Sequence, residues 1–462
     1  MGGYSCILPC LSIVSITFAA ITNVPADSLT NQVGKSQPGN RNASPKQRVI
    51  ATKTIENAHF DFLRALHAEE PKKSGKFLGR LSRASKDLPG YKIKEYNSYL
   101  KSYFPNASSD HVQWYMIESY IVQKKWDEVQ VGLLKFAYLY PNSSIYKKVL
   151  DNGYTLLQEE KYFGSVRDKL ITLLNDAPKT GKMHSRYFDF LAAVHGFKDK
   201  RLRSIFERES WEFLTRYANR SRGSTVLMWL AQLEQENNNF HPAVMIYEKL
   251  MTLYPASQDY AAALYQVAML KQEKFSDYNE ATVSFRKFLK QFPEHNYGAH
   301  AQYRIATMAD KNFSDWSTAI EEYGKLAASH PNFKYTIPSL LRIGEIQATK
   351  LKLKEEAIST YNRIASEYPD STMQATEAHQ RAGKLYENGK EYEKAIDQYM
   401  AIHENYPGTE GALENLGKCA VIYEKKLKQK DKAIEILNTI IKEFPESKNA
   451  KRAAKRIKKL NK

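Results

Sequence analysis

The stretch AIEEYGKLAASHP, residues 319–331, sets a pattern that recurs along the chain. It places Ala319, Tyr323 and Pro331 at offsets 0, 4 and 12. The pattern returns every 38 residues, with Phe or Leu at the middle position in two copies, as Ala243/Tyr247/Pro255, Ala281/Phe285/Pro293, Ala357/Tyr361/Pro369, Ala395/Tyr399/Pro407 and Ala433/Leu437/Pro445. A fixed period of this length is typical of a solenoid of stacked repeats.

The spacing predicts a helical hairpin in each repeat. Offsets 0 and 4 share one face of a helix, so the small residue admits a neighbouring helix and the aromatic residue fills the gap beside it. The proline disfavours helical geometry in the residue before it and ends the helix. An upstream helix carries its own small residue, as at Ala306, Gly344 and Gly383. We therefore expect burial between helices of Tyr323, Tyr361 and Tyr399.

At these residues, over 240–447, the chain resembles the tetratricopeptide repeat family. That family's second helix carries a small residue, an aromatic residue, a further small or apolar residue and a proline at matching offsets. Repeats ending in Tyr-Pro-x-Ser, as at residues 368–371, are similar to those of two periplasmic groups. These are the lipoprotein subunit of the outer-membrane β-barrel assembly machine and the coordinator protein of the Tol–Pal system. The resemblance implies an all-α, right-handed α-solenoid of about ten repeats.

Residues 1–26 are typical of a secretory signal peptide. An uncharged apolar run precedes Val24-Pro25-Ala26, which predicts cleavage after Ala26. The first residues hold no Lys or Arg and the run is just long enough to span a bilayer, so an uncleaved N-terminal membrane anchor is the alternative. Residues 27–48 are polar and rich in Asn, Ser, Gly and Pro, which predicts a disordered linker.

The repeat pattern continues upstream in a weaker form. Phe104-Pro105, Tyr140-Pro141 and Ala177-Pro178 keep spacings of 36 and 37 residues, and Tyr217-Ala218 falls near the next position. We therefore predict degenerate helical repeats over residues 49–220, a tetratricopeptide array over 221–446 and a basic C-terminal capping helix over 447–462.

The chain is basic, with a formal net charge of +17. In the last helix Ala450, Ala453, Ala454, Ile457 and Leu460 can form one apolar stripe, as a solvating cap requires. The other face is a candidate contact for an anionic surface such as lipid headgroups, through Lys451, Arg452, Lys455, Arg456, Lys458 and Lys459. Elsewhere basic and acidic residues alternate without a nucleic-acid-binding motif, so no nucleic acid partner is expected.

No sequence motif for catalysis, a metal or a cofactor is present. Cys6 and Cys10 lie in the leader, and Cys419 has a helical apolar context that favours a buried thiol. Residues 208–211, Arg-Glu-Ser-Trp, resemble the catalytic-acid motif of soluble lytic transglycosylases. The substrate-holding segment of that family has only a poor counterpart in residues 226–229, so we interpret Glu209 as structural.

The sequence thus predicts a non-catalytic scaffold for protein–protein interactions in cell-envelope assembly or maintenance. We expect it to be exported to the periplasm, where association with the outer membrane is one option. A groove lined by the first helix of each hairpin would hold peptides or helices of other envelope proteins. The residues expected to face it are Tyr265, Tyr303, Glu345, Gln380 and Glu414. A peptidoglycan-acting enzyme or accessory subunit and a membrane-surface adaptor are the alternatives.

Overall fold

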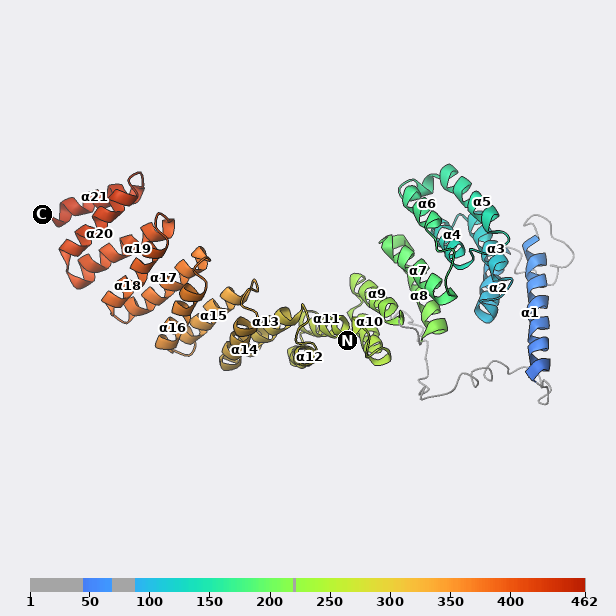
Figure 1. The fold of residues 1–462 in the computed structure, drawn as a ribbon, viewed down its shortest axis with the longest axis horizontal. Helices are drawn as coiled ribbons and strands as arrows, with labels where there is room; N and C mark the ends of the chain where they lie inside the picture. Colours follow the sequence, from blue (N-terminus) through green and yellow to red (C-terminus); the bar gives the residue numbers. More distant parts are fainter. Residues whose placement is uncertain (1–44, 69–87, 219–221, 462) are drawn as a thin grey trace, which may run out of the picture. The chain divides into compact units, whose positions relative to one another are not determined.

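The computed structural model describes residues 45–68, 88–218 and 222–461. These residues form helices and connecting turns with no strand among them (Figure 1), which confirms the predicted all-α fold class. The chain divides into two compact units, Met1–Lys125 and Trp126–Lys462. The predicted signal peptide and residues 27–44 of the predicted linker lie outside the described residues.

The first unit contains three described helices, α1 (Pro45–Ala68), α2 (Leu88–Tyr103) and α3 (Ser109–Val122). Helix α2 packs against both of the others, and Leu63, Tyr96, Tyr99 and Ile117 are fully buried. Helix α1 begins at Pro45, a residue favoured in the first helical turn, so the helix starts inside the range 27–48 that was assigned to the linker.

The second unit opens with five helices and two short 3-10 turns. They are α4 (Trp126–Leu139), α5 (Tyr146–Glu159), η4 (Lys161–Phe163), α6 (Arg167–Asn175), α7 (Met183–Gly196), η5 (Lys200–Leu202) and α8 (Arg203–Tyr217). Helix α4 is buried along most of its length and packs on α6 and α7. Because α4 reaches α7 across two intervening helices, this region departs from simple neighbour-on-neighbour stacking.

The rest of the second unit is a regular array of helical hairpins (Figure 1). The hairpins are α9 (Gly223–Glu236) with α10 (Phe240–Leu253), α11 (Asp259–Glu273) with α12 (Tyr278–Gln291), α13 (Gly298–Met308) with α14 (Trp316–Ser329), α15 (Thr336–Thr349) with α16 (Lys354–Glu367), α17 (Thr372–Asn388) with α18 (Tyr392–Asn405), and α19 (Glu410–Ile422) with α20 (Lys430–Glu443). Two first helices end in π-helical turns, η6 (Ala309–Phe313) and η7 (Tyr423–Leu427). Helix α21 (Lys448–Leu460) ends the described chain.

The second helix of every hairpin ends where the proline rule predicts. The residue before each proline leaves the helix, with φ of −131° and ψ of 59° at Tyr254 and similar values at its equivalents. The proline ring excludes helical geometry there. The predicted packing is confirmed too, since Ala319 is fully buried and Tyr323, Tyr361 and Tyr399 are each 2% exposed.

The first helices carry a small residue every 38 positions. Ala268, Ala306, Gly344, Ala382 and Ala420 occupy this position, and all five are buried. In α21 the same position holds Lys458, which is exposed. The 38-residue register of the array therefore continues into α21. The small residue that lets a second helix pack closely is replaced there by Lys458.

The turn inside each hairpin is left-handed at one residue. Its φ lies between 54° and 63° in all six hairpins, again every 38 residues, at Asn238, Ser276, Ser314, Lys352, Lys390 and Lys428. Residues other than glycine are strained in this left-handed region of φ and ψ. The same backbone solution is thus used in every hairpin even though its sequence varies.

Candidate functional site

Successive first helices touch each other, as α9 touches α11 and α15 touches α17. One position on these helices recurs every 38 residues as Gln266, Arg304, Arg342, Gln380, Lys418 and Arg456. Its three arginines reach back to an acceptor on the preceding first helix or its π-helical turn. Arg304 donates to Gln272, Arg342 to Asp310 and Arg456 to Glu424. We call Arg304, Arg342 and Arg456 the arginine ladder.

The central pair of the ladder is the best buried. Nε and Nη2 of Arg342 each donate to a carboxylate oxygen of Asp310 at 2.8 Å, and the Asp310 side chain is 0% exposed. The π-helical turn η6 carries Asp310 toward α15. Such bidentate, charge-assisted pairs fix geometry as well as adding stability. The hydrogen bonds to Asp310 also raise the pKa of Arg342, so its guanidinium group stays charged.

The predicted groove-facing residues fall into two groups. Tyr265 is only 7% exposed, stacks on Tyr297 at 4.6 Å and meets Phe285 and Phe288 edge-on. The prediction that Tyr265 faces the groove is therefore wrong. Its ring packs in the core against aromatic residues of its own repeat and of the next repeat. Tyr303 is half-buried and repeats this arrangement by stacking on Tyr335 at 4.6 Å.

The three polar residues of the predicted set are accessible on the first-helix face. Glu345 pairs with Arg342 at 3.1 Å and with Arg381 at 3.8 Å. Gln380 is half-exposed, and exposed Glu414 pairs with Lys418 at 2.8 Å. Salt bridges at such exposed positions add little stability, so these side chains can exchange partners when a ligand arrives.

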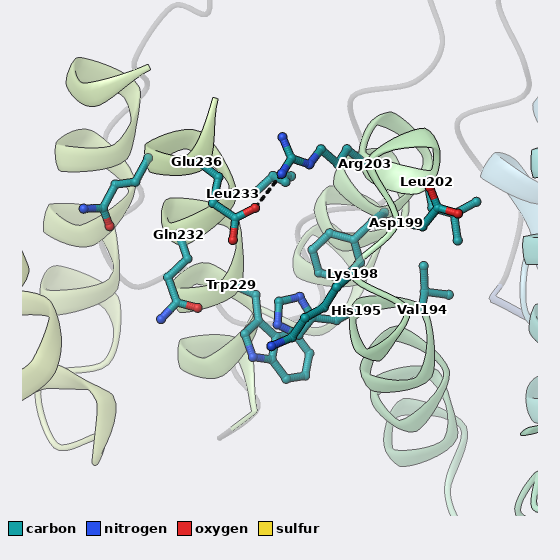
Figure 2. A pocket seen from close by; sticks show the side chains of 12 residues that line it. Val194, His195, Lys198, Asp199, Leu202, Arg203, Trp229, Gln232, Leu233 and Glu236 are labelled. Atoms are coloured by element: carbon teal, nitrogen blue, oxygen red, sulfur yellow. Dashed lines mark hydrogen bonds and ion pairs between the residues drawn. The ribbon is translucent and has the colours of Figure 1, made fainter. Parts of the chain in front are cut away.

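A pocket of about 460 Å³ lies between α7, α8 and α9. Figure 2 shows Trp229 and His195 face to face within it, with the ion pair of Arg203 and Glu236 nearby. The Trp229 and His195 rings stack at 4.8 Å, and Phe188 also stacks on Trp229, at 5.2 Å. Burial, with nearby Lys198, lowers the pKa of His195 and so favours the neutral imidazole.

The lining of this pocket suits binding. Apolar surface comes from Val194, Leu202, Phe206, Trp229 and Leu233, while polar groups stand around it. A mixed lining of this kind takes an apolar side chain of a peptide and orients it by hydrogen bonds. The 38-residue pattern gives no sign of this pocket, because two of the three helices that line it, α7 and α8, lie in the irregular part of the unit. The one available signal was an aromatic, Trp229, on a helix with an otherwise aliphatic core.

Glu209 lies inside the second unit among groups that keep it ionised. Nζ of Lys135 donates to its carboxylate at 2.6 Å and the hydroxyl of Tyr187 donates at 2.9 Å, while Arg208 lies 3.6 Å away. Burial alone would raise the pKa of Glu209, but Lys135 and Arg208 outweigh it and the pKa is lowered. A general acid for glycan cleavage needs the opposite shift.

The rest of the transglycosylase resemblance has no structural support. Val226, Leu227 and Met228, the counterpart of the substrate-holding segment, are buried core residues of α9. No cluster of three or more metal-ligating side chains occurs in the described part of the chain. Cys419 is buried, which confirms the predicted thiol environment, and burial raises its pKa to about 12. Among the described residues no helix is long and apolar enough to cross a membrane.

A second pocket, of about 630 Å³, lies between α19, α20 and α21. Four of the six candidate anionic-contact residues line it: Arg452, Lys455, Arg456 and Lys459. The predicted apolar stripe of α21 is correct for Ala450 and Ala453, which are buried, and for Ile457 and Leu460, which pack on the core. Ala454 is instead exposed, because it lies past the edge of the face that α21 presents to α19 and α20.

Stacked hairpins with this small-residue and aromatic packing define an α-helical repeat protein of the class that binds other proteins. The family model for the tetratricopeptide repeat matches residues 225–257, 262–295, 339–371, 377–409 and 418–447. These hairpins are tetratricopeptide repeats. The hairpin α13–α14, between the second and third matched segments, keeps the same period.

Several solved structures are similar to the chain. The C-terminal part of a TPR repeat-containing protein from Cytophaga hutchinsonii is 15% identical, covers 58% of this chain and 98% of its own length, and has a TM-score of 0.36. YrrB, described as a TPR protein with an unusual peptide-binding site, is 19% identical over 44% and 96%, with a TM-score of 0.30. PilW, described as a type IV pilus biogenesis factor, is 12% identical over 51% and 100%, with a TM-score of 0.28.

Likenesses at this level carry no argument about function. No curated protein matches the chain significantly. The resemblance to the two periplasmic groups is not confirmed by these comparisons and stays a prediction.

Proposed function

We propose that this protein is a non-catalytic scaffold of the cell envelope that binds extended or helical segments of other proteins along the face made by its first helices. The observation that carries the proposal is the array itself. Its first helices touch in succession and present accessible polar residues at Glu345, Gln380 and Glu414. Tetratricopeptide repeats are built to bind protein partners on such surfaces.

The place of action rests on the sequence of residues 1–26. A secretory leader ending at Ala26 would deliver the chain to the periplasm, and its retention would make it a membrane anchor instead. N-terminal sequencing of the exported protein distinguishes the two, because cleavage removes Cys6 and Cys10 whereas an anchor keeps them.

A lytic enzyme is disfavoured by the environment of Glu209. Its carboxylate is ion-paired and held in the charged form, and three of the four residues that would hold substrate, Val226, Leu227 and Met228, are buried. A membrane-surface adaptor is disfavoured because the apolar stripe of α21 is already packed against α19 and α20. An interfacial helix needs that stripe free to enter the lipid.

Photo-crosslinking at defined positions tests the scaffold proposal. A crosslinking residue at Glu345 or Glu414 should capture the same envelope protein. The matched control is Glu355, which is also accessible but lies on the second helix α16. Peptides from the captured protein should compete with crosslinking from the first-helix positions. Equal capture from Glu355, or no competition by any segment of the partner, would contradict binding along this face.

A further inference from the structure

We propose that the pocket between α19, α20 and α21 binds an acidic amphipathic helix of a protein partner. Apolar side chains of that helix lie on the pocket floor and its carboxylates meet the basic rim. The inference rests on the proposed scaffold function and adds the chemistry of one partner segment. It assigns a binding site to the last three helices of the array, α19, α20 and α21.

Helix α21 differs from the first helices before it at the position where a second helix would pack. It takes the register of a first helix and packs on α20. The position that is small in α11 to α19, as at Ala420, is Lys458 in α21. Another apolar hairpin, or a second copy of this array, would have to bury that ammonium group without a partner, at a large cost. A helix that brings carboxylates meets no such penalty.

The pocket pairs an apolar floor with a basic rim. The floor is formed by Leu413, Gly417, Ala420, Val421 and Leu460. A Cβ built on Gly417 meets nothing within 4 Å, so the space above this part of the floor is open. The volume of the whole pocket, about 630 Å³, lies in the range of pockets that hold a small-molecule ligand or several side chains.

The rim of the pocket carries positive charges that no acidic side chain of the described residues pairs with. Helix α21 carries seven basic residues and no acidic one. Arg456 is satisfied by Glu424. Arg452, Lys455 and Lys459 have no salt bridge within the described residues, and all three are exposed beside the floor. Charge complementarity therefore selects an anionic occupant, and the apolar floor selects one with an apolar side.

A protein helix fits these features better than a membrane. Ala450 and Ala453 of α21 are buried, while Ile457 and Leu460 pack with Leu416 and its neighbours, so α21 has no free apolar face to insert. The open apolar surface lies at the bottom of a pocket, below basic side chains. Side chains projecting from a helix can enter such a hollow, which is the helix-in-groove mode of recognition.

The test measures binding of a fluorescein-labelled synthetic helix to the full chain by anisotropy. The probe has leucines along one face and glutamates on the others, and a second probe replaces the glutamates by glutamine. The rim variant is Arg452→Glu/Lys455→Glu/Lys459→Glu. The matched control is Lys442→Glu/Lys448→Glu/Lys451→Glu, which makes the same charge change at exposed positions of α20 and of the start of α21 that do not line the pocket. Thermal melting establishes that both variants fold.

We expect the rim variant to weaken binding about tenfold or more, and the control variant to change it about threefold or less. The glutamine probe should bind weakly, and a lysine version of the probe should bind the rim variant. Equal losses in the two variants would overturn the proposal, as would binding to phosphatidylglycerol vesicles without binding of the glutamate probe. Failure here leaves capture at Glu345 and Glu414 unaffected, so it is distinguishable from failure of the scaffold proposal.

Discussion

The ring of Tyr361 lies directly over the backbone of Gly344. A Cβ built on Gly344 would stand 2.5 Å from Cε1 of Tyr361, closer than real Cβ contacts allow. One repeat further on, a Cβ on Gly383 would stand 2.6 Å from Cε1 of Tyr399. At both places the second helix approaches its first helix through a tyrosine, and the missing side chain sets how close the two helices come.

Replacing these glycines should therefore destabilise the array. Gly344→Ala and Gly383→Ala should each lower the free energy of unfolding by about 1–3 kcal/mol, because a packed ring must move. Gly324→Ala is the matched control, since nothing lies within 4 Å of a Cβ at this helical position. It should instead add about 0.5–1 kcal/mol. Urea unfolding measures all three, and a stabilising Gly344→Ala would show that the close approach is wrong.

Tyr323→Ala should be among the most damaging single changes. Its ring is 2% exposed and belongs to the core shared by α13 to α17. Truncating a large buried side chain leaves a cavity and costs about 3–5 kcal/mol. The thermal midpoint should fall clearly, whereas truncation of exposed Met373 should leave it nearly unchanged. An unaltered melt for Tyr323→Ala would contradict the packing described.

Glu209→Gln should destabilise the protein without removing a catalytic activity. Loss of the charge leaves Lys135 partly buried without its partner, at a cost of roughly 3 kcal/mol. Glu128→Gln, which breaks the more exposed pair with Arg208, should cost less than about 1 kcal/mol. Neither wild type nor Glu209→Gln should release muropeptides from purified sacculi. Release by wild type that Glu209→Gln abolishes would instead establish a lytic enzyme.

The lowered pKa of Glu209 also predicts a pH dependence. The folded state holds this carboxylate ionised below its ordinary pKa of 4.5, so its contribution to stability is present above that pH. The contribution is lost as the pH falls further through the folded-state pKa. Unfolding measured from pH 6 down to pH 3 should therefore show a shallower decline in Glu209→Gln than in wild type.

Glycine at the left-handed turns should stabilise the array. Lys352→Gly, Lys390→Gly and Lys428→Gly each relieve a residue with φ near 60°, for a gain of about 1 kcal/mol. Lys384→Gly, at an exposed position inside α17, should instead cost about 1 kcal/mol. Opposite signs of the change in thermal midpoint are the expected result. Losses at all four positions would mean that the turns are not strained.

Cys419 should be inert while the protein is folded. Burial raises its thiol pKa to about 12, so the reactive thiolate is scarce at pH 8. Labelling by a thiol reagent should be slow in buffer and fast in urea. Because the folded-state pKa lies above the ordinary value of 9.0, stability should also fall as the pH rises from about 9 toward 12. Rapid labelling under native conditions would contradict the buried position.

The fold could be predicted from the sequence because the same helix-to-helix packing contact recurs in every repeat. The Ala–Tyr–Pro spacing at Ala319, Tyr323 and Pro331 fixes a helix, its buried face and its end, and each copy strengthens the same inference. Side-chain direction at Tyr265 was beyond that reasoning, since its ring is placed by Tyr297 from the next repeat. The 38-residue period predicts where the helices lie. The burial of a given side chain also depends on which side chains the neighbouring helix and turn place against it.

The candidate sites were only partly accessible to sequence reasoning. The basic residues of α21 were evident, but their division between the pocket rim and its outer face needed the packing of Ala453 against α19 and α20. The pocket at Trp229 brings α9 of the regular array together with α7 and α8, which the 38-residue period does not describe. The arginine ladder could have been found, because Arg304, Arg342 and Arg456 keep the 38-residue register.

The arginine ladder gives the array unequal joints. Separating α13 from α15 must pull Arg342 away from a buried carboxylate, and separating α19 from α21 must break the pair of Arg456 with Glu424. Between α17 and α19 the ladder positions hold Tyr386 and Lys418, and no ion pair joins these two helices in the described structure. A load applied along the array is therefore resisted at that joint by packing and by the hydrogen bond that the Tyr406 hydroxyl donates to the Pro369 carbonyl oxygen. The joint just before the last three helices thus lacks the ion pair found at the joints on either side of it, and we expect it to open more easily than they do under load.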